Sequence, residues 1–336
     1  MTTWRAMAAG ASLVLLLAGC GGGQDTTGGD EQTPPPAPTA EQTELTEDPT
    51  GAPPQVPVEQ TDIDVVGDGK SEHLMDVHLP EVGEGPFPVV MWVHGGGWQG
   101  GDKSDVMRGE DIQMVQTTQF LRENGFAVAA GNYHVLPDTQ FPEPMQDVAA
   151  AVRYLRAHAA ELGVDPDRIA LMGDSAGAHL AAMVALTADR PDLQGTLGDT
   201  STDARVDAFV GYYGLYDLSQ RTQNQIDQCG GARPGAESSH GRLVGVDPDT
   251  PEGQDQAKEA SPTHHVNADS PPVLLFHGTQ DCTAPEAQAQ DFKAALDANG
   301  VTNELTVIEK AHGDPQFWTD DAIHQQLLTF LQSHVN

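Results

Sequence analysis

From about Thr61 onwards, short apolar runs alternate along the chain with longer stretches of helical periodicity. The apolar runs predict strands at 61–66, 74–79, 88–93, 126–133, 169–172, 206–213, 272–276 and 304–308. Helices are expected at 105–124, 144–162, 176–186, 284–298 and 322–331. Alternation of this kind is typical of a mainly parallel central sheet with helices on both faces. The sequence therefore predicts a single α/β domain over residues 61–336.

Two segments without this pattern precede the domain. Residues 1–19 carry one charge, Arg5, followed by an uncharged and mostly apolar run, which predicts a signal peptide. Residues 20–60 are acidic, rich in Pro, Gly and Thr, and contain no Lys or Arg. Such a composition buries too little apolar surface to offset the loss of chain entropy, so we expect a disordered tether.

The end of the first segment, Leu-Ala-Gly-Cys at 17–20, resembles a bacterial lipobox. The resemblance implies cleavage before Cys20 and lipidation of its thiol, so that the membrane becomes a partner through an N-terminal lipid anchor. We then expect an exported protein on the outer face of the bacterial cell membrane. A plain secretory signal that is cleaved nearby is the alternative.

One serine stands at the junction of a predicted strand and a predicted helix. Residues 173–177 read Gly-Asp-Ser-Ala-Gly and fit the pattern G-x-S-x-G. This pattern is typical of a sharp strand-to-helix turn that exposes a serine hydroxyl at the positive end of a helix. Ser175 is therefore the candidate nucleophile, and an ordinary glycine-rich turn is the alternative.

A serine nucleophile needs a histidine base and a carboxylate that orients it. Asp281 follows the strand predicted at 272–276, and His312 follows the last predicted strand. The carboxyl ends of parallel strands share one edge of a sheet. We therefore expect Ser175, Asp281 and His312 to meet there, in the chain order serine, acid, histidine.

Backbone amides are expected to hold a negatively charged oxygen beside this serine. The amide of Ala176 supplies one, and the loop after His94 supplies others from Gly95 and Gly96, with Gly97 possible. Trp98 follows directly and either lines the substrate pocket or packs in the core.

The remaining polar residues near these motifs are assigned structural roles. Asp174 is expected to point away from the attacking face, His277 to order its turn, and His324 to lie at the surface or in packing. His264 and His265 are adjacent but lack the spacing of a metal site, so we predict no metal and no cofactor.

Four motifs together carry a family resemblance. HGGGW with GDK at 94–103, GDSAG at 173–177, HGTQD at 277–281 and AHG at 311–313 resemble bacterial α/β-hydrolase esterases. The resemblance is to the hormone-sensitive-lipase-like group and to the acetylxylan/feruloyl esterase-like group. It implies an α/β-hydrolase fold and a serine esterase that acts on short-chain or acetyl/feruloyl-type esters, on small molecules or linked to polysaccharide. An amidase or peptidase with the same residues, and a lipid-anchored binding protein without activity, are the alternatives.

Charge narrows the range of partners. The chain has 16 basic and 50 acidic residues and a formal net charge of −34. This charge repels phosphate backbones and disfavours strongly anionic substrates, so we expect no nucleic acid partner.

Two cysteines remain after Cys20. An even pair in an exported protein favours a disulfide between Cys229 and Cys282, and two buried free thiols are the alternative. Residues 214–260 form the least regular segment. They either cover the edge where the serine lies or are a surface insertion.

Overall fold

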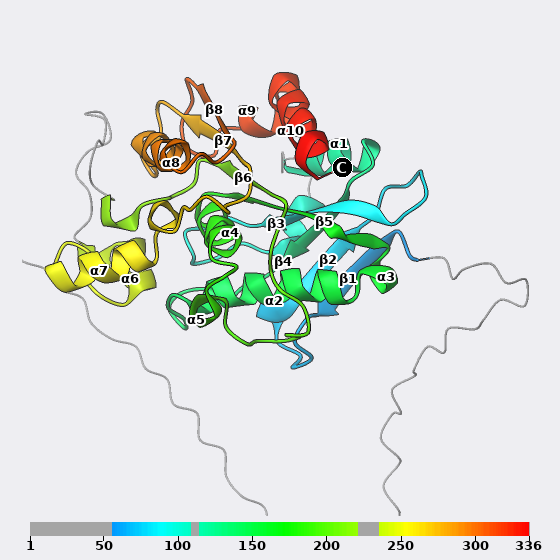
Figure 1. Cartoon of the computed structure of the whole chain (residues 1–336), viewed down its shortest axis with the longest axis horizontal. Coiled ribbons are helices and arrows are strands. Elements are labelled where there is room, and N and C mark those ends of the chain that lie inside the picture. Colours follow the sequence, from blue (N-terminus) through cyan, green and yellow to red (C-terminus); the bar gives the residue numbers. More distant parts are fainter. Residues whose placement is uncertain (1–55, 109–113, 221–234, 336) are drawn as a thin grey trace, which may run out of the picture. The chain divides into compact units, whose positions relative to one another are not determined.

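The apolar runs form one mixed sheet with the strand order β1-β2-β4-β3-β5-β6-β7-β8 (Figure 1). The computed structural model describes residues 56–108, 114–220 and 235–335, all of them within one unit, Gln55–Asn336. The strands are β1 (Glu59–Asp64), β2 (Leu74–His78), β3 (Phe87–Val93), β4 (Ala127–Gly131), β5 (Val164–Asp174), β6 (Ala208–Tyr212), β7 (Val273–Gly278) and β8 (Asn303–Ile308).

Most strand pairs are parallel, as the sequence predicts. Only β2 runs antiparallel to its neighbours β1 and β4 within the described sheet. From β4 onwards, every neighbouring pair is parallel. The carboxyl ends of β3, β5, β7 and β8 therefore lie along one edge. These are the strands that the predicted site residues follow.

Helices cover both faces of the sheet (Figure 1). They are α1 (Met114–Glu123), α2 (Glu143–Ala157), α3 (Ala159–Leu162), α4 (Ala176–Leu186), α5 (Pro191–Gln194), α6 (Ser239–Val244), α7 (Pro251–Glu259), α8 (Ala287–Ala298), α9 (Gln316–Thr319) and α10 (Asp321–His334). The alternation of side chains along β3 shows the two layers. Val89, Met91 and Val93 pack with α2, α4 and α8, whereas Val90 and Trp92 pack with α1, α9 and α10.

Some element boundaries differ from the sequence prediction. The strand predicted at 169–172 extends back to Val164, because Val164 pairs with Phe87 at the start of β3. Its polar residues 165–168 hide this extension from an apolar-run criterion. The helix predicted at 105–124 is described as α1 from Met114, after a separate 3-10 turn, η2 (Lys103–Val106), that Asp102 caps.

The irregular segment contains more structure than predicted. Its described part holds α6 and α7, and the side chains of Ser238 and Thr250 cap their N-termini. Residues 221–234 of this segment lie outside the described residues, as do the predicted signal peptide and the tether up to residue 55. No helix in the described ranges is both long and apolar enough to span a membrane.

Two glycines allow α4 to begin directly against the sheet. A Cβ on Gly177 would lie 2.0 Å from the carbonyl oxygen of Val93, and one on Gly173 would lie 2.7 Å from the backbone of Gly177. Neither position can hold a side chain unless α4 moves away from β3 and β5. The GxSxG spacing is therefore a packing requirement of this turn.

We predict that Gly177→Ala lowers the free energy of unfolding by about 2 kcal/mol or more, because the added methyl overlaps a fixed backbone carbonyl. Urea unfolding followed by circular dichroism measures the change. Gly100→Ala is the matched control, since a Cβ at Gly100 meets no atom within 4 Å, and it should stay within about 0.5 kcal/mol of wild type. Equal stability of the two variants would contradict the packing explanation.

Candidate active site

Ser175 sits in a strained turn between β5 and α4. Its backbone has φ 51° and ψ −118°, a conformation that costs a non-glycine residue about 1–3 kcal/mol. The amide of Ser175 donates a 2.9 Å hydrogen bond to the carbonyl of Tyr212 in β6, which helps to hold the turn. The side chain stands at the N-terminus of α4, whose positive end favours negative charge.

His312 connects this serine to the predicted acid. Its Nε2 lies 2.8 Å from the Oγ of Ser175, and its Nδ1 lies 2.7 Å from the Oδ2 of Asp281. The three residues come from the ends of β5, β7 and β8. The structure thus brings together the three residues that the sequence singled out.

Asp281 is fixed by hydrogen bonds on both of its oxygens. Its Oδ1 accepts hydrogen bonds of 2.8 Å from the amides of Thr283 and Ala284, which leaves Oδ2 for His312. The nearby His277 is fully buried, and its Nε2 lies 2.7 Å from the carbonyl of Ala284. Burial lowers the pKa of His277, so a neutral ring orders this turn, as predicted.

The His312 ring is partly exposed to solvent. Its side chain is 20% exposed, whereas that of Asp281 is fully buried. The ring of Tyr213 meets the His312 ring edge-on, with 4.7 Å between ring centroids. A substrate can therefore reach the serine and the imidazole while the carboxylate stays away from water.

The glycine loop supplies fewer free amides than predicted. The amide of Gly95 donates a 2.8 Å hydrogen bond to Oδ1 of Asp174, so it is already occupied. Among the described residues, no acceptor is paired with the amides of Gly96, Gly97 or Ala176. Gly96 and Gly97 have φ of 108° and 63°, which residues with a Cβ rarely adopt. These three amides remain available to a bound oxygen.

A family model described as BD-FAE matches residues 75–296, a range that includes the glycine loop, Ser175 and Asp281. The chain belongs to the BD-FAE family. Its α/β-hydrolase fold is shared with solved esterase structures. A truncated carbohydrate esterase from gut microbiota superposes with a TM-score of 0.73 at 27% identity, covering 83% of this chain and 96% of that one. A thermophilic esterase from Thermogutta terrifontis gives 0.61 at 26% identity, covering 83% and 94%.

Two curated relatives from Mycobacterium tuberculosis are more similar in sequence. Esterase LipQ is 34% identical over 73% of this chain and 55% of its own length. The probable carboxylic ester hydrolase LipM is 35% identical over 67% of this chain and 48% of its own length. The chain therefore spans about half the length of these relatives.

Asp174 has a structural role in this BD-FAE chain, as predicted. A Cβ on Gly95 would lie 2.3 Å from the Asp174 carboxylate, so only glycine allows this close approach. Burial raises the pKa of Asp174 from 3.8 to about 7. The side chain next to the nucleophile therefore fixes the first residue of the glycine loop.

Trp98 is buried rather than open to a pocket. It is 1% exposed, and its Nε1 donates a 3.3 Å hydrogen bond to Nδ1 of His179 in α4. Burial lowers the pKa of His179 to about 4, and its Nε2 bonds the carbonyl of Ala260 at 2.7 Å. The Trp98 ring also meets that of His240 in α6, with centroids 5.6 Å apart. Of the two roles left open for Trp98, these contacts fit packing.

Two supporting residues were not singled out individually from the sequence. The hydroxyl of Tyr133 donates to the carbonyl of His94 at 2.8 Å, and its ring stacks on the His94 ring. Lys103 of the GDK motif is buried, with its Nζ 2.6 Å from Asp76 and 2.8 Å from Asp62. The position of Tyr133 at the end of the strand predicted at 126–133 was the available signal. For Lys103, the available signal was that the chain contains few lysines.

Two further predictions, a disulfide and the absence of a metal, are not tested by the structure. Cys229 lies outside the described residues, so its bridge to Cys282 stays a prediction. His264 and His265 do not form a ligand cluster. The Nε2 of His264 is 3.4 Å from Asp217, and the Nε2 of His265 bonds the carbonyl of Glu259. A different group, formed by His73, His134 and Asp147, could hold a metal ion and shares no residue with the Ser175–His312–Asp281 set.

We predict that Asp174 makes the stability of the protein depend on pH. Because the folded-state pKa lies above the unfolded value, the folded carboxyl retains its proton to higher pH. Its contribution is complete below about pH 4 and is lost as the pH rises through 7, by at most about 4 kcal/mol. Urea unfolding at pH 4 to 8 should therefore show wild type losing stability relative to Asp174→Asn. The exposed control Asp189→Asn should follow wild type, and parallel curves for all three proteins would refute the assignment.

Proposed function

We propose that the chain is a serine-dependent carboxylic ester hydrolase that works through an acyl-enzyme. The observation that carries the proposal is the position of His312, hydrogen-bonded to Ser175 Oγ on one side and to Asp281 on the other. A hydroxyl, an imidazole and a buried carboxylate in this order form an activated nucleophile. The esterase names of the BD-FAE chain's relatives and structural neighbours support the same class of reaction.

The reaction follows from the atoms that face one another. Ser175 Oγ attacks the ester carbonyl while its proton passes to Nε2 of His312. The amides of Gly96, Gly97 and Ala176 hold the oxyanion that forms. His312 then gives the proton to the departing alcohol, which leaves an acyl group on Ser175.

Water completes the cycle with the roles reversed. His312 takes a proton from water, and the hydroxide that forms adds to the acyl carbonyl. The proton then returns to Ser175 as the acid departs. Asp281 accepts the Nδ1–H of His312 and keeps the ring in place throughout.

The proposed substrates are neutral esters with short acyl groups, of acetyl or feruloyl type, on small molecules or on polysaccharide. Two observations support this class. One solved neighbour is titled a carbohydrate esterase, and another an acetyl ester-xyloside bifunctional hydrolase. The formal net charge of −34 disfavours strongly anionic substrates.

Two other functions use the same residues differently. An amidase or peptidase would share the nucleophile but would have to protonate a poorer leaving group. A lipid-anchored binding protein would not need His312 within hydrogen-bond distance of Ser175. The complete hydrogen-bond chain favours a catalyst over this second alternative.

We also propose that the protein is lipid-anchored at the outer face of the bacterial cell membrane. The Leu-Ala-Gly-Cys sequence before Cys20 and the acidic tether that follows support this location. A single acyl chain binds a membrane only marginally, so a stable anchor would carry more than one chain.

Ser175→Ala should lower kcat for p-nitrophenyl acetate by at least about 10⁴-fold, because it removes the nucleophile. The same variant should no longer be labelled by a fluorophosphonate probe. Circular dichroism establishes that it still folds, and Ser201→Ala, at an exposed turn, is the control that should retain wild-type activity. A Ser175→Ala protein that keeps substantial turnover would refute the mechanism.

Ester and amide substrates distinguish the two enzyme classes. We expect p-nitrophenyl acetate to be cleaved at least about 100-fold faster than p-nitroacetanilide, with kcat/KM falling as the acyl chain lengthens from acetyl to octanoyl. Acetylated xylan and methyl ferulate complete the panel. A higher kcat/KM for the anilide would assign an amidase instead.

Cys20→Ser tests the location. In a bacterial host, wild type should incorporate radiolabelled palmitate and sediment with membranes, whereas Cys20→Ser should do neither. Cys282→Ser is the control for labelling at another cysteine. Palmitate uptake that persists in Cys20→Ser would exclude this anchor.

A further inference from the structure

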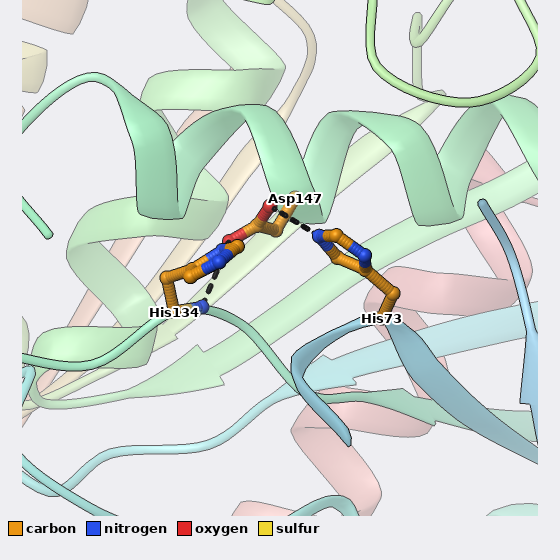
Figure 2. A group of neighbouring side chains, drawn as sticks. All are labelled: His73, His134 and Asp147. Atoms are coloured by element: carbon orange, nitrogen blue, oxygen red, sulfur yellow. Dashed lines mark hydrogen bonds and ion pairs between the residues drawn. The ribbon is translucent and has the colours of Figure 1, made fainter. Parts of the chain in front are cut away.

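A second cluster of polar side chains lies where three separate segments meet. His73 ends the 3-10 turn η1 (Ser71–His73) before β2, His134 follows β4, and Asp147 projects from α2. Figure 2 shows the Asp147 carboxylate between the two imidazole rings. One ligand atom from each residue lies within 4.8 Å of the others, and the ring centroids are 5.1 Å apart.

Each histidine has one ring nitrogen beside an outer carboxylate and the other ring nitrogen beside Asp147. The Nδ1 of His73 lies 2.9 Å from Asp68, and its Nε2 lies 3.3 Å from Oδ1 of Asp147. The Nε2 of His134 lies 3.2 Å from Glu72, and its Nδ1 lies 2.8 Å from Oδ2 of Asp147. Metal-binding histidines typically donate one N–H to an outer carboxylate and turn the other nitrogen towards the metal. Both rings fit that arrangement around Asp147.

Burial makes this arrangement unfavourable without a positive charge. The side chains of His73 and Asp147 are each 1% exposed. Within the described residues, His73 Nε2 and Asp147 Oδ1 face one another without any hydrogen-bond partner. If the proton of a neutral His73 is on Nδ1, two lone pairs oppose each other at 3.3 Å. A cation between them removes this repulsion.

The net charge of the whole cluster also favours a bound cation. With neutral rings, Asp68, Glu72 and Asp147 give the cluster a charge of about −3 at neutral pH. Either two extra protons or a divalent ion would compensate most of this charge.

We propose that His73, His134 and Asp147 bind a divalent transition-metal ion of the zinc type. Two imidazole nitrogens and a carboxylate are ligands that Zn²⁺ accepts, with a fourth position left for water or another oxygen. Ligand atoms around a tetrahedral Zn²⁺ are roughly 3.4 Å apart, given bond lengths near 2.1 Å. The 3.3 Å between His73 Nε2 and Asp147 Oδ1 is close to this spacing.

A cavity of about 270 Å³ reaches the edge of the cluster at His134. Its lining includes His134 and three acidic residues, Glu72, Asp102 and Asp138. Acidic walls raise the local concentration of cations near the cluster.

The bound ion would act on structure rather than take part in ester cleavage. It would join the start of β2, the segment after β4 and α2. Tyr133, next to His134, donates hydrogen bonds to the carbonyls of His94 and Gly95 in the glycine loop. Metal binding would therefore restrict the loop that supplies oxyanion donors.

Zinc binding to the full chain tests the proposal. Protein stripped with EDTA and dialysed should bind one Zn²⁺ per chain in isothermal titration calorimetry. It should also unfold several degrees higher when Zn²⁺ is in large excess over Kd. His73→Gln and His134→Gln should each weaken binding at least about tenfold. His158→Gln is the matched control, because His158 also pairs with a carboxylate, Glu161, at an exposed site, and it should bind like wild type.

Several results would overturn the proposal. One is that wild type binds no zinc, which would mean that protons alone compensate the charge of the cluster. Another is that His73→Gln and His134→Gln bind zinc as tightly as wild type. If those variants fail to fold, X-ray absorption spectroscopy of zinc-loaded wild type decides, because two imidazole ligands are expected and fewer would refute the site. None of these measurements uses ester hydrolysis, so their outcome is independent of the proposed function.

Discussion

The contact between Gly177 and the last carbonyl of β3 determines how the rest of the site is arranged. Because α4 begins against this backbone, the chain must turn sharply at Ser175 and accept a positive φ there. Val93 and Gly173 are paired neighbours in the sheet, so the glycine loop and the nucleophile turn leave the sheet side by side. The loops after β7 and β8 then bring Asp281 and His312 to the same edge.

Sequence patterns were sufficient to predict the site residues that lie in loops after the carboxyl ends of strands. Parallel strands bring their carboxyl ends to one edge, so residues in the loops that follow them, such as Ser175 and His312, meet there even though they are far apart along the chain. Asp281 lies three residues beyond the end of β7 and still belongs to this group. The two antiparallel pairs formed by β2 do not alter this edge.

Other features depend on side-chain direction, which residue patterns do not contain. Gly95 was expected to present its amide to substrate, but Asp174 occupies that amide. Trp98 follows the loop immediately, yet its ring turns into the core against His179. His73, His134 and Asp147 come from three segments with no common motif, so only the folded chain brings them together. Each case required knowing which atoms face one another.

The hydrogen bond between Asp174 and Gly95 links two functions of the site that are usually considered separately. Asp174 directly precedes the residue that carries the attacking hydroxyl, and its side chain holds the first peptide of the loop that receives negative charge. A mutational library that randomises position 174 would therefore change nucleophile geometry and transition-state stabilisation together. Variants from it could not be assigned to either effect by rate measurements alone, and this shared residue limits how independently the two could evolve.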